Sequence, residues 1–264
     1  MSTEAYEIVK TARSGARYTG FDFIKGIFSK FVELHGDRRY SDDSAIIGGV
    51  AYLGSCPVTV IAIEKGHNAR ERMQRSFGMP NPEGYRKALR LMKQAEKFHR
   101  PVICFVDTAG AYCGIGAEER GQGLAIAENL SEMMTLNTPV ISILIGEGGS
   151  GGALALSVAD RVYMLENAVY SVISPEGCAS ILWKDAAKAP EAAQSLKLTA
   201  KDALSLGIIE DMISEENMEA PEFFTELRDR LAGELEILKN DSDLLAHRYE
   251  RFRRIGSADQ GDHT

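Results

Sequence analysis

The stretch Gly146-Glu147-Gly148-Gly149-Ser150-Gly151-Gly152 decides how the rest of the sequence is interpreted. It follows an apolar run, residues 140–145, that is typical of a buried strand, and it precedes small residues, 153–159, that predict a short helix. A strand that runs through glycines into a helix leaves main-chain N–H groups free at the positive helix end. Such a bend can hold an anion, or an oxygen on which negative charge develops during a reaction.

The glycine run also has to be compared with other kinds of glycine-rich loop. A P-loop needs Lys followed by Ser or Thr after its last glycine, whereas Ala153 and Leu154 follow here. A dinucleotide-binding loop expects an acidic residue about 20 residues further on. Glu166 lies near that offset, so this alternative stays open. A tight turn without a ligand is also possible, but five glycines in seven residues are more than a turn needs.

The composition is that of an ordinary soluble protein. The chain has 264 residues, a net charge of −8, 44% hydrophobic and 26% charged residues. The acidic balance argues against nucleic acid as the main partner. No apolar run could span a bilayer and no apolar signal core follows Met1, so we expect a cytoplasmic protein. The cysteines are scattered without a C-x-x-C pair and predict reduced thiols rather than a metal site: Cys56, Cys104, Cys113 and Cys178.

Strands alternate with helices along the chain, which predicts an α/β protein with largely parallel pairing. We expect strands at residues 46–53, 58–63, 102–106, 140–145, 162–165, 169–172 and 208–213. Gly54-Ser55 between the first two predicts that they form a hairpin. Expected helices cover residues 21–34, a segment opening at Pro82, and residues 118–134 with Leu124, Ala127, Leu130 and Met134 as their apolar positions. A short helix is expected between Thr199 and Gly207, with a capping box between Thr199 and Asp202. The last expected helix covers residues 224–238, with an apolar face made of Phe224, Leu227, Leu231, Leu235 and Leu238. We expect residues 1–20 to form a loose arm, 21–256 a single domain, and 257–264 a polar tail.

A second glycine-bearing loop, residues 107–116, also follows an expected strand. Ligands of such folds lie at the carboxyl ends of the strands, so we expect this loop and the 146–152 bend to share one rim and face one cavity. Asp107 is expected to cap the loop that follows it. The five histidines stand in polar or terminal stretches and are expected at the surface. The basic residues Arg70, Arg72 and Arg75 are interpreted as a solvated face rather than an anchor for a phosphorylated ligand or an acidic partner.

Several long motifs resemble a known family. Thr199-Ala200-Lys201-Asp202-Ala203-Leu204-Ser205-Leu206-Gly207-Ile208-Ile209 resembles the helix-to-strand element of the crotonase superfamily. The closer resemblance is to the carboxyltransferase α subunits of bacterial acetyl-CoA carboxylase. It covers nearly the whole chain and is carried by residues 77–90, Gly114-Ile115-Gly116-Ala117-Glu118-Glu119-Arg120-Gly121-Gln122, the run from Gly146 to Ala155, and Tyr170-Ser171-Val172-Ile173-Ser174-Pro175-Glu176-Gly177 continuing to Trp183.

The resemblance implies a crotonase (ClpP/crotonase-like) fold of repeated ββα units with C-terminal helices. It also implies an α2β2 assembly whose active site lies between an α and a β subunit. The implied reaction moves a carboxyl group from carboxybiotin, on the biotin carboxyl carrier protein, to acetyl-CoA and gives malonyl-CoA, the first committed step of fatty acid synthesis. Zinc is expected in the β subunit and no metal in this chain. ATP is used by a separate biotin carboxylase.

The resemblance also implies site residues. The backbone N–H groups of Gly151 and Gly152 are expected to form an oxyanion hole on the biotin side. Substrate is expected to lie against a further set of small residues: Gly148, Gly149, Gly110, Ala111 and Gly114. The family commonly has proline where this chain has Ala109 and Cys113, and both changes are interpreted as tolerated variation in a loop that proline would stiffen.

Two alternatives from other classes stay open. A stand-alone crotonase-type acyl-CoA hydratase or isomerase would need acidic side chains over the thioester, and this sequence offers Glu118, Glu119, Glu147 and Glu176. A non-catalytic scaffold or regulatory paralogue has slight support from Ala109 and Cys113. No Ser-His-Asp or Cys-His nucleophile set is evident, and Cys178 is interpreted as a small buried residue at a helix start.

Overall fold

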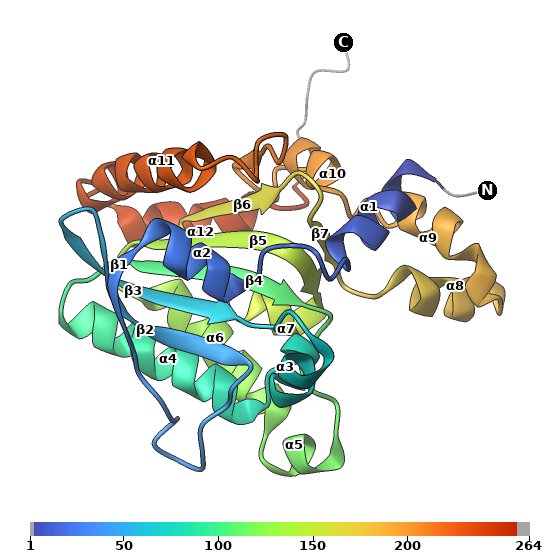
Figure 1. Cartoon of the computed structure of the whole chain (residues 1–264), viewed down its shortest axis with the longest axis horizontal. Coiled ribbons are helices and arrows are strands. Elements are labelled where there is room, and N and C mark those ends of the chain that lie inside the picture. Colours follow the sequence, from blue (N-terminus) through green and yellow to red (C-terminus); the bar gives the residue numbers. More distant parts are fainter. Residues whose placement is uncertain (1–2, 258–264) are drawn as a thin grey trace.

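The computed structural model describes residues 3–257, and within them one mixed sheet of eight strands forms the centre of the molecule (Figure 1). The strand order is β1-β2-β3-β4-β5-β6-β8, and β7 pairs with the far end of β5. The strands are β1 (Ser29–Glu33), β2 (Ile46–Leu53), β3 (Cys56–Ile63), β4 (Val102–Thr108), β5 (Val140–Gly149), β6 (Arg161–Leu165), β7 (Val169–Ser171) and β8 (Asp211–Ile213).

The pairing pattern confirms the expected α/β class. β2 and β3 form the predicted antiparallel hairpin, and β1 adds to it on the outer side. From β3 onward the neighbouring strands run parallel. All seven residues of β4 are buried, as expected for a parallel strand covered on both faces. The register sets Thr108 of β4 beside Gly148 of β5, so the ends of these two strands lie side by side.

Helices cover both faces of the sheet (Figure 1). α4 (Pro82–Lys97) and α6 (Gln122–Thr135) lie on one face, and α2 (Gly20–Ile27) and α11 (Glu222–Lys239) lie on the other. α4 opens on the predicted proline, which suits a first helical turn because that turn has no acceptor for the missing N–H. Further helices are α3 (Ala69–Gln74), α5 (Ile115–Glu119), α7 (Ser150–Leu154), α10 (Ala200–Ser205) and α12 (Leu244–Arg254). Two 3-10 turns cover Ser76–Gly78 and Ala186–Lys188.

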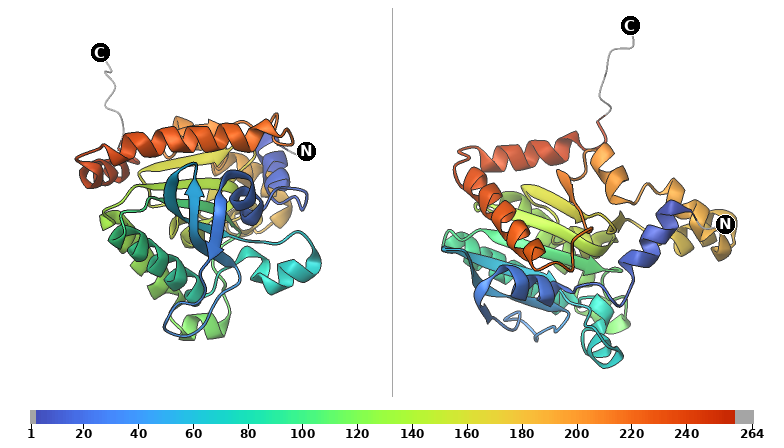
Figure 2. Two further views of the ribbon diagram at one scale, coloured as in Figure 1. Left: turned by 60° about the vertical axis from the view of Figure 1, so that its left-hand side comes forward. Right: turned by 45° about the horizontal axis from the view of Figure 1, so that its top comes forward.

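A group of three helices lies beyond the carboxyl ends of β5 and β7. These are α1 (Glu4–Ala12), α8 (Pro175–Trp183) and α9 (Ala189–Ser195), which stay together in all three views (Figures 1 and 2). Val9 and Ala12 of α1 are buried in a small apolar cluster with Ala193 and Leu198. The expectation of a loose arm over residues 1–20 is therefore wrong for residues 3–20. Val9 and Ala12 share a helix face, but a partner for that face exists only in the folded molecule.

Three expected elements differ in extent. The helix expected over residues 21–34 ends at Ile27, and the following residues form the edge strand β1, because Phe28 takes an extended conformation and β2 offers a pairing partner. The helix expected over residues 118–134 is divided, since α5 ends at Glu119 and α6 begins at Gln122. Its expected apolar stripe is confirmed only in part: Leu130 and Met134 pack partly buried against the core, whereas Leu124 is 64% exposed. The fully buried side chains of α6 are Gln122, Ala125, Asn129 and Met133. The helix expected at 153–159 is α7, which starts at Ser150 and is only five residues long.

Two predicted features of the C-terminal part are confirmed. The short helix α10 begins with the expected capping box between Thr199 and Asp202, and Gly207 follows it with φ +65°. α11 buries the expected leucines of its inner face. Of the expected polar tail, only Ser257 lies within the described residues. Within residues 3–257, every helix is too short or too polar to cross a membrane.

Candidate functional site

The site forms where the ends of β4 and β5 turn out of the sheet. A Cβ added to Gly149 would lie 2.2 Å from the carbonyl oxygen of Ala109, and one added to Gly152 would lie 2.5 Å from the amide nitrogen of Ala111. Any larger side chain would push the two bends apart, since real Cβ atoms essentially never come within 3.0 Å of another heavy atom. The two glycine-bearing loops therefore share one rim, as expected from the sequence.

The glycines at the end of β5 serve this close packing. Gly148 is buried and paired with Thr108 on one side and Tyr170 on the other, and a Cβ on it would meet a methyl group of Leu144 at 2.3 Å. Gly110 on the β4 loop has φ +151° and donates its N–H to the Thr108 hydroxyl. These positions bring Gly148, Gly149, Gly110 and Ala111 together. Gly114 stands apart at the start of α5, against the ring of Tyr112.

Gly151 and Gly152 lie in the first turn of α7. The first N–H groups of a helix have no partner inside the helix, and no side chain within residues 3–257 caps the start of α7. Ser150, just before them, has φ +50°, a left-handed conformation that non-glycine residues rarely adopt. Local strain of this kind is common where a loop must aim its main chain at a ligand. Gly152 is buried, whereas Gly151 is only partly covered.

Directly behind the bend lies a largely buried ion cluster that the sequence did not predict. The Lys65 ammonium lies 2.6 Å from the Asp107 carboxylate and 3.0 Å from the Glu147 carboxylate. Asp107 also accepts a hydrogen bond of 2.8 Å from the main-chain N–H of Glu147, so it ties β4 to the β5 bend instead of capping its own loop. The position of Asp107 also requires glycine at residue 146, because a Cβ there would lie 2.4 Å from an Asp107 oxygen.

The contacts in the cluster hold Lys65 and Glu147 in their charged forms. Burial by itself would lower the pKa of Lys65. The negative charges of Asp107 and Glu147 have the larger effect, so the net pKa lies above its ordinary value. Burial by itself would raise the pKa of Glu147. The attraction of Lys65 and Arg13 is larger, so the net effect is a lowered pKa for this carboxyl. Glu147 is therefore a stable carboxylate rather than a proton donor.

Arg13 joins the N-terminal helix to this cluster. Its guanidinium lies 2.8 Å from Glu147 and 2.8 Å from Glu176 at the start of α8. The Tyr6 hydroxyl donates a hydrogen bond of 3.0 Å to Glu176. Burial by itself would raise the pKa of Glu176. The hydrogen bond and the charge of Arg13 have the larger effect, so the net pKa of Glu176 is lowered as well. Both carboxylates are thus engaged by cations, which does not favour them as the free acid or base of a hydratase. Glu118 and Glu119, the other two candidates, are exposed on α5.

Two cavities flank this cluster. One of about 70 Å³ lies between Val9, the end of β5 and the 171–175 segment. The other, of about 230 Å³, is lined by Arg17, Lys65, Arg72 and Phe77 among others. Arg13, Ala109 and Glu147 line both. The cavities therefore open on either side of the side chains that hold the bend in place.

Sequence reasoning missed the cluster because its members stand far apart in the chain. In the structure Gly78, in the 77–90 segment that carries the family resemblance, packs against Lys65: its φ is +73°, and a Cβ on it would meet the Lys65 side chain at 2.4 Å. Neither quantity can be read from the sequence. The described histidines are exposed, as expected, and His263 lies outside the described residues. Cys178 is buried at 8% exposure in α8, as expected for a packing residue.

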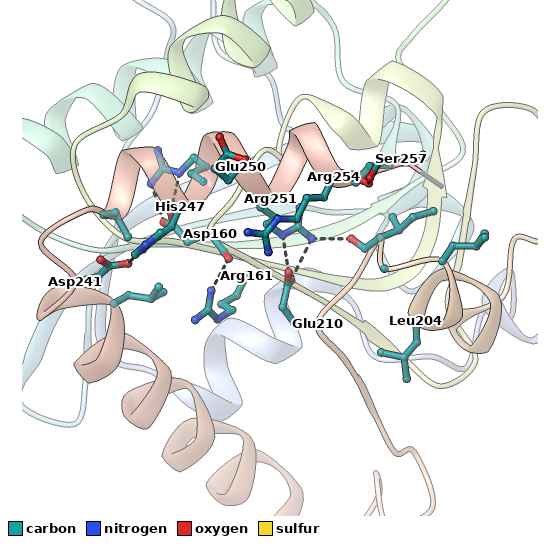
Figure 3. Close-up of a pocket in the computed structure, with 18 of the residues that line it drawn as sticks. Asp160, Arg161, Leu204, Glu210, Asp241, His247, Glu250, Arg251, Arg254 and Ser257 are labelled. Atoms are coloured by element: carbon teal, nitrogen blue, oxygen red, sulfur yellow. Dashed lines mark hydrogen bonds and ion pairs between the residues drawn. The ribbon is translucent and has the colours of Figure 1, made fainter. Parts of the chain in front are cut away.

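A larger cavity, of about 1120 Å³, lies between α10 and α12, and its lining does not include the glycine bends (Figure 3). Its lining contains two ion pairs, Arg251 with Glu210 and Arg248 with Asp160. Within residues 3–257 there is no group of three or more His, Cys, Asp or Glu side chains that could hold a metal ion.

Solved structures of other proteins share the fold of this chain. Transcarboxylase 12S, solved with methylmalonyl-coenzyme A and methylmalonic acid bound, superposes with a TM-score of 0.71 at 21% identity over 89% of this chain and 44% of its own. A Pseudomonas malonate decarboxylase hetero-tetramer in complex with coenzyme A matches with a TM-score of 0.66 at 20% identity over 82% of this chain and 91% of its own. The fold is that of the crotonase-type carboxyltransferases, as expected.

Sequence comparison narrows the class to one family. A family model described as acetyl co-enzyme A carboxylase carboxyltransferase-like matches residues 2–256. The acetyl-coenzyme A carboxylase carboxyl transferase subunit alpha of Ruminiclostridium cellulolyticum is 57% identical over 97% of this chain and 99% of its own length. That of Streptococcus sanguinis is 55% identical over 96% and 99%. The chain belongs to the family of acetyl-CoA carboxylase carboxyltransferase α subunits, which confirms the resemblance found in the sequence.

Proposed function

We propose that this chain is the α subunit of an acetyl-CoA carboxylase carboxyltransferase, which transfers the carboxyl group of carboxybiotin to acetyl-CoA and yields malonyl-CoA. The proposal rests on identity of 55–57% to α subunits over nearly the full chain, and on the uncapped N–H groups at Gly151 and Gly152. Acetyl-CoA carboxylation belongs to fatty acid synthesis, and the proposed location is the cytoplasm.

The residues at the bend fit a ligand that gains negative charge. Transfer of the carboxyl group leaves negative charge on the ureido oxygen of biotin, and carboxybiotin supplies this chemistry when the carrier protein presents it. In our proposal the N–H groups of Gly151 and Gly152 donate to that oxygen. Main-chain donors suit this role because they are already oriented and do not titrate. Gly148, Gly149, Gly110, Ala111 and Gly114 are the proposed substrate contacts.

The proposed assembly is an α2β2 complex in which a zinc-bearing β subunit supplies the other half of the active site. The proposed further partners are the biotin carboxyl carrier protein and biotin carboxylase. Among residues 3–257, the cavities beside the bend are small, at about 70 and 230 Å³, and such volumes do not enclose an acyl-CoA. We therefore propose that coenzyme A is bound mainly by the partner.

The test is reconstitution. The chain is mixed with a β subunit of a related acetyl-CoA carboxylase, and carboxyl transfer is measured in reverse as malonyl-CoA decarboxylation with free biotin as acceptor. We expect co-purification of the two chains and biotin-dependent turnover. A stand-alone hydratase would instead hydrate an unsaturated acyl-CoA without the β subunit. A complex that forms but does not transfer the carboxyl group would indicate a scaffold and would overturn the proposal.

A further inference from the structure

The hydroxyl of Tyr85 lies beneath the two bends without a hydrogen-bond partner. Tyr85 belongs to α4 and its side chain is 0% exposed. Among residues 3–257, its hydroxyl oxygen has no hydrogen-bond partner. Burial raises the pKa of this phenol well above its ordinary value, so the group keeps its proton and remains a donor.

The hydroxyl stands at the junction of the two bends. Its oxygen lies 2.9 Å from the position that a Cβ on Gly152 would take, and the same position is 2.5 Å from the amide nitrogen of Ala111. The ring is packed in an apolar cluster with Ala125 and Ala155, and with Ala111 and Ile126 at its edge. This packing fixes the ring, so the hydroxyl is held against the main chain of both bends.

An unpaired buried donor is unusual and costs free energy. It stands beside a second unusual feature, the left-handed conformation of Ser150 at the start of α7. Each feature is a local cost that folded proteins generally avoid. The Tyr85 hydroxyl would be satisfied if a bend peptide rotated so that its carbonyl oxygen faced this hydroxyl. The observed arrangement of the bends is therefore not the one that satisfies Tyr85.

We propose that Tyr85 is a positioning residue, whose hydroxyl donates to a main-chain carbonyl of the 149–152 or 109–111 bend when the site carries its anionic ligand. The physical reason is the geometry of the peptide unit. In a trans peptide the N–H and C=O groups point in opposite directions, so a bend that aims its N–H groups outward at a ligand turns carbonyl oxygens inward. Tyr85 lies on the inner side. This inference rests on the proposed function of Gly151 and Gly152.

The test is Tyr85→Phe, which removes one oxygen and leaves the ring in place. In the complex with the β subunit, we expect kcat for carboxyl transfer to fall about five- to tenfold, the effect of one neutral hydrogen bond made only in the reacting state. KM for malonyl-CoA is expected to stay the same, because Tyr85 does not touch the substrate. The melting temperature of the chain is expected to stay the same or rise, since an unpaired polar group is removed.

Tyr163→Phe is the matched control. Tyr163 is 2% exposed in β6, and burial, together with its interaction with Glu234, raises the pKa of its hydroxyl. Its loss is expected to lower the melting temperature and to leave kcat unchanged. A Tyr85→Phe chain with a lowered melting temperature would mean that the hydroxyl already has a partner in the free chain, and an unchanged kcat would mean that it does not position the bend. Either result overturns the inference. Failure of the wild-type complex to transfer the carboxyl group would overturn the proposed function instead.

Discussion

Gly152→Ala adds a single methyl group where the 149–152 bend packs closely against the 109–111 bend. The new Cβ would lie 2.5 Å from Ala111 N, 2.8 Å from the carbonyl carbon of Gly110 and 2.9 Å from the Tyr85 hydroxyl. Two of these atoms belong to the main chain and the third to a ring fixed by packing, so none can give way by a simple side-chain rotation. Ordinary van der Waals contact begins at 3.4 Å. The two bends must therefore separate by roughly 1 Å.

This displacement decides the expected effect. A reacting group misplaced by about 1 Å can cost about 100-fold in rate, and removal of one oxyanion-hole donor costs about 100- to 1000-fold. We therefore expect kcat of the reconstituted complex to fall at least about 100-fold. Overpacking of a buried site typically costs about 1–3 kcal/mol of stability, which a protein of this size can survive. The variant is expected to fold and to assemble with its partner.

The assay is malonyl-CoA decarboxylation by the complex, with urea unfolding of the isolated chain as the measure of stability. Gly233→Ala is the control for the glycine-to-alanine change, because it lies in α11 with open space around its Cβ; we expect unchanged turnover and a gain of about 0.5–1 kcal/mol. Gly151→Ala, whose Cβ would meet Ile126 at an ordinary 3.5 Å, is expected to lose less than about tenfold in rate. A folded, assembled Gly152→Ala complex with wild-type turnover would refute the reasoning.

Three further predictions concern the ion pairs. The pKa of Glu147 is lowered from 4.5, so its contribution to stability is complete above pH 4.5 and is lost as the pH falls through its folded-state pKa. Glu147→Gln should therefore flatten the acid side of the urea-unfolding profile, and an unchanged profile would contradict this. Arg13→Ala should speed amide exchange in α1 while β4 and β5 stay protected; equal exchange in both chains would show that Arg13 does not hold α1. Arg248, fully buried, binds Asp160 and the carbonyls of Met133, Leu136 and Thr138. Arg248→Met should cost about 3–5 kcal/mol in urea unfolding, and a loss below 1 kcal/mol would argue against a structural role.

The elements that the sequence predicted well are those with a local signal. The hairpin around Gly54-Ser55, the proline at the start of α4 and the capping box at Thr199 all depend on residues within a few positions of one another. The errors arose where an element depends on a distant partner. α2 stops at Ile27 because β2 offers an edge for the next residues, and α1 is packed because α9 receives Val9 and Ala12.

The sequence by itself determined the α/β class, the family and the glycine bend, because hydrophobic periodicity and long motifs are read along the chain. Only the tertiary structure decided what surrounds the bend. Lys65, Asp107 and Glu147 meet through the parallel register of neighbouring strands, and Arg13 reaches Glu147 across 134 positions. Charged side chains carry no periodic signal of their partners, and a tyrosine hydroxyl carries none at all. Their contacts depend on how the side chains pack, and this packing is fixed only by the order of the strands in the folded sheet.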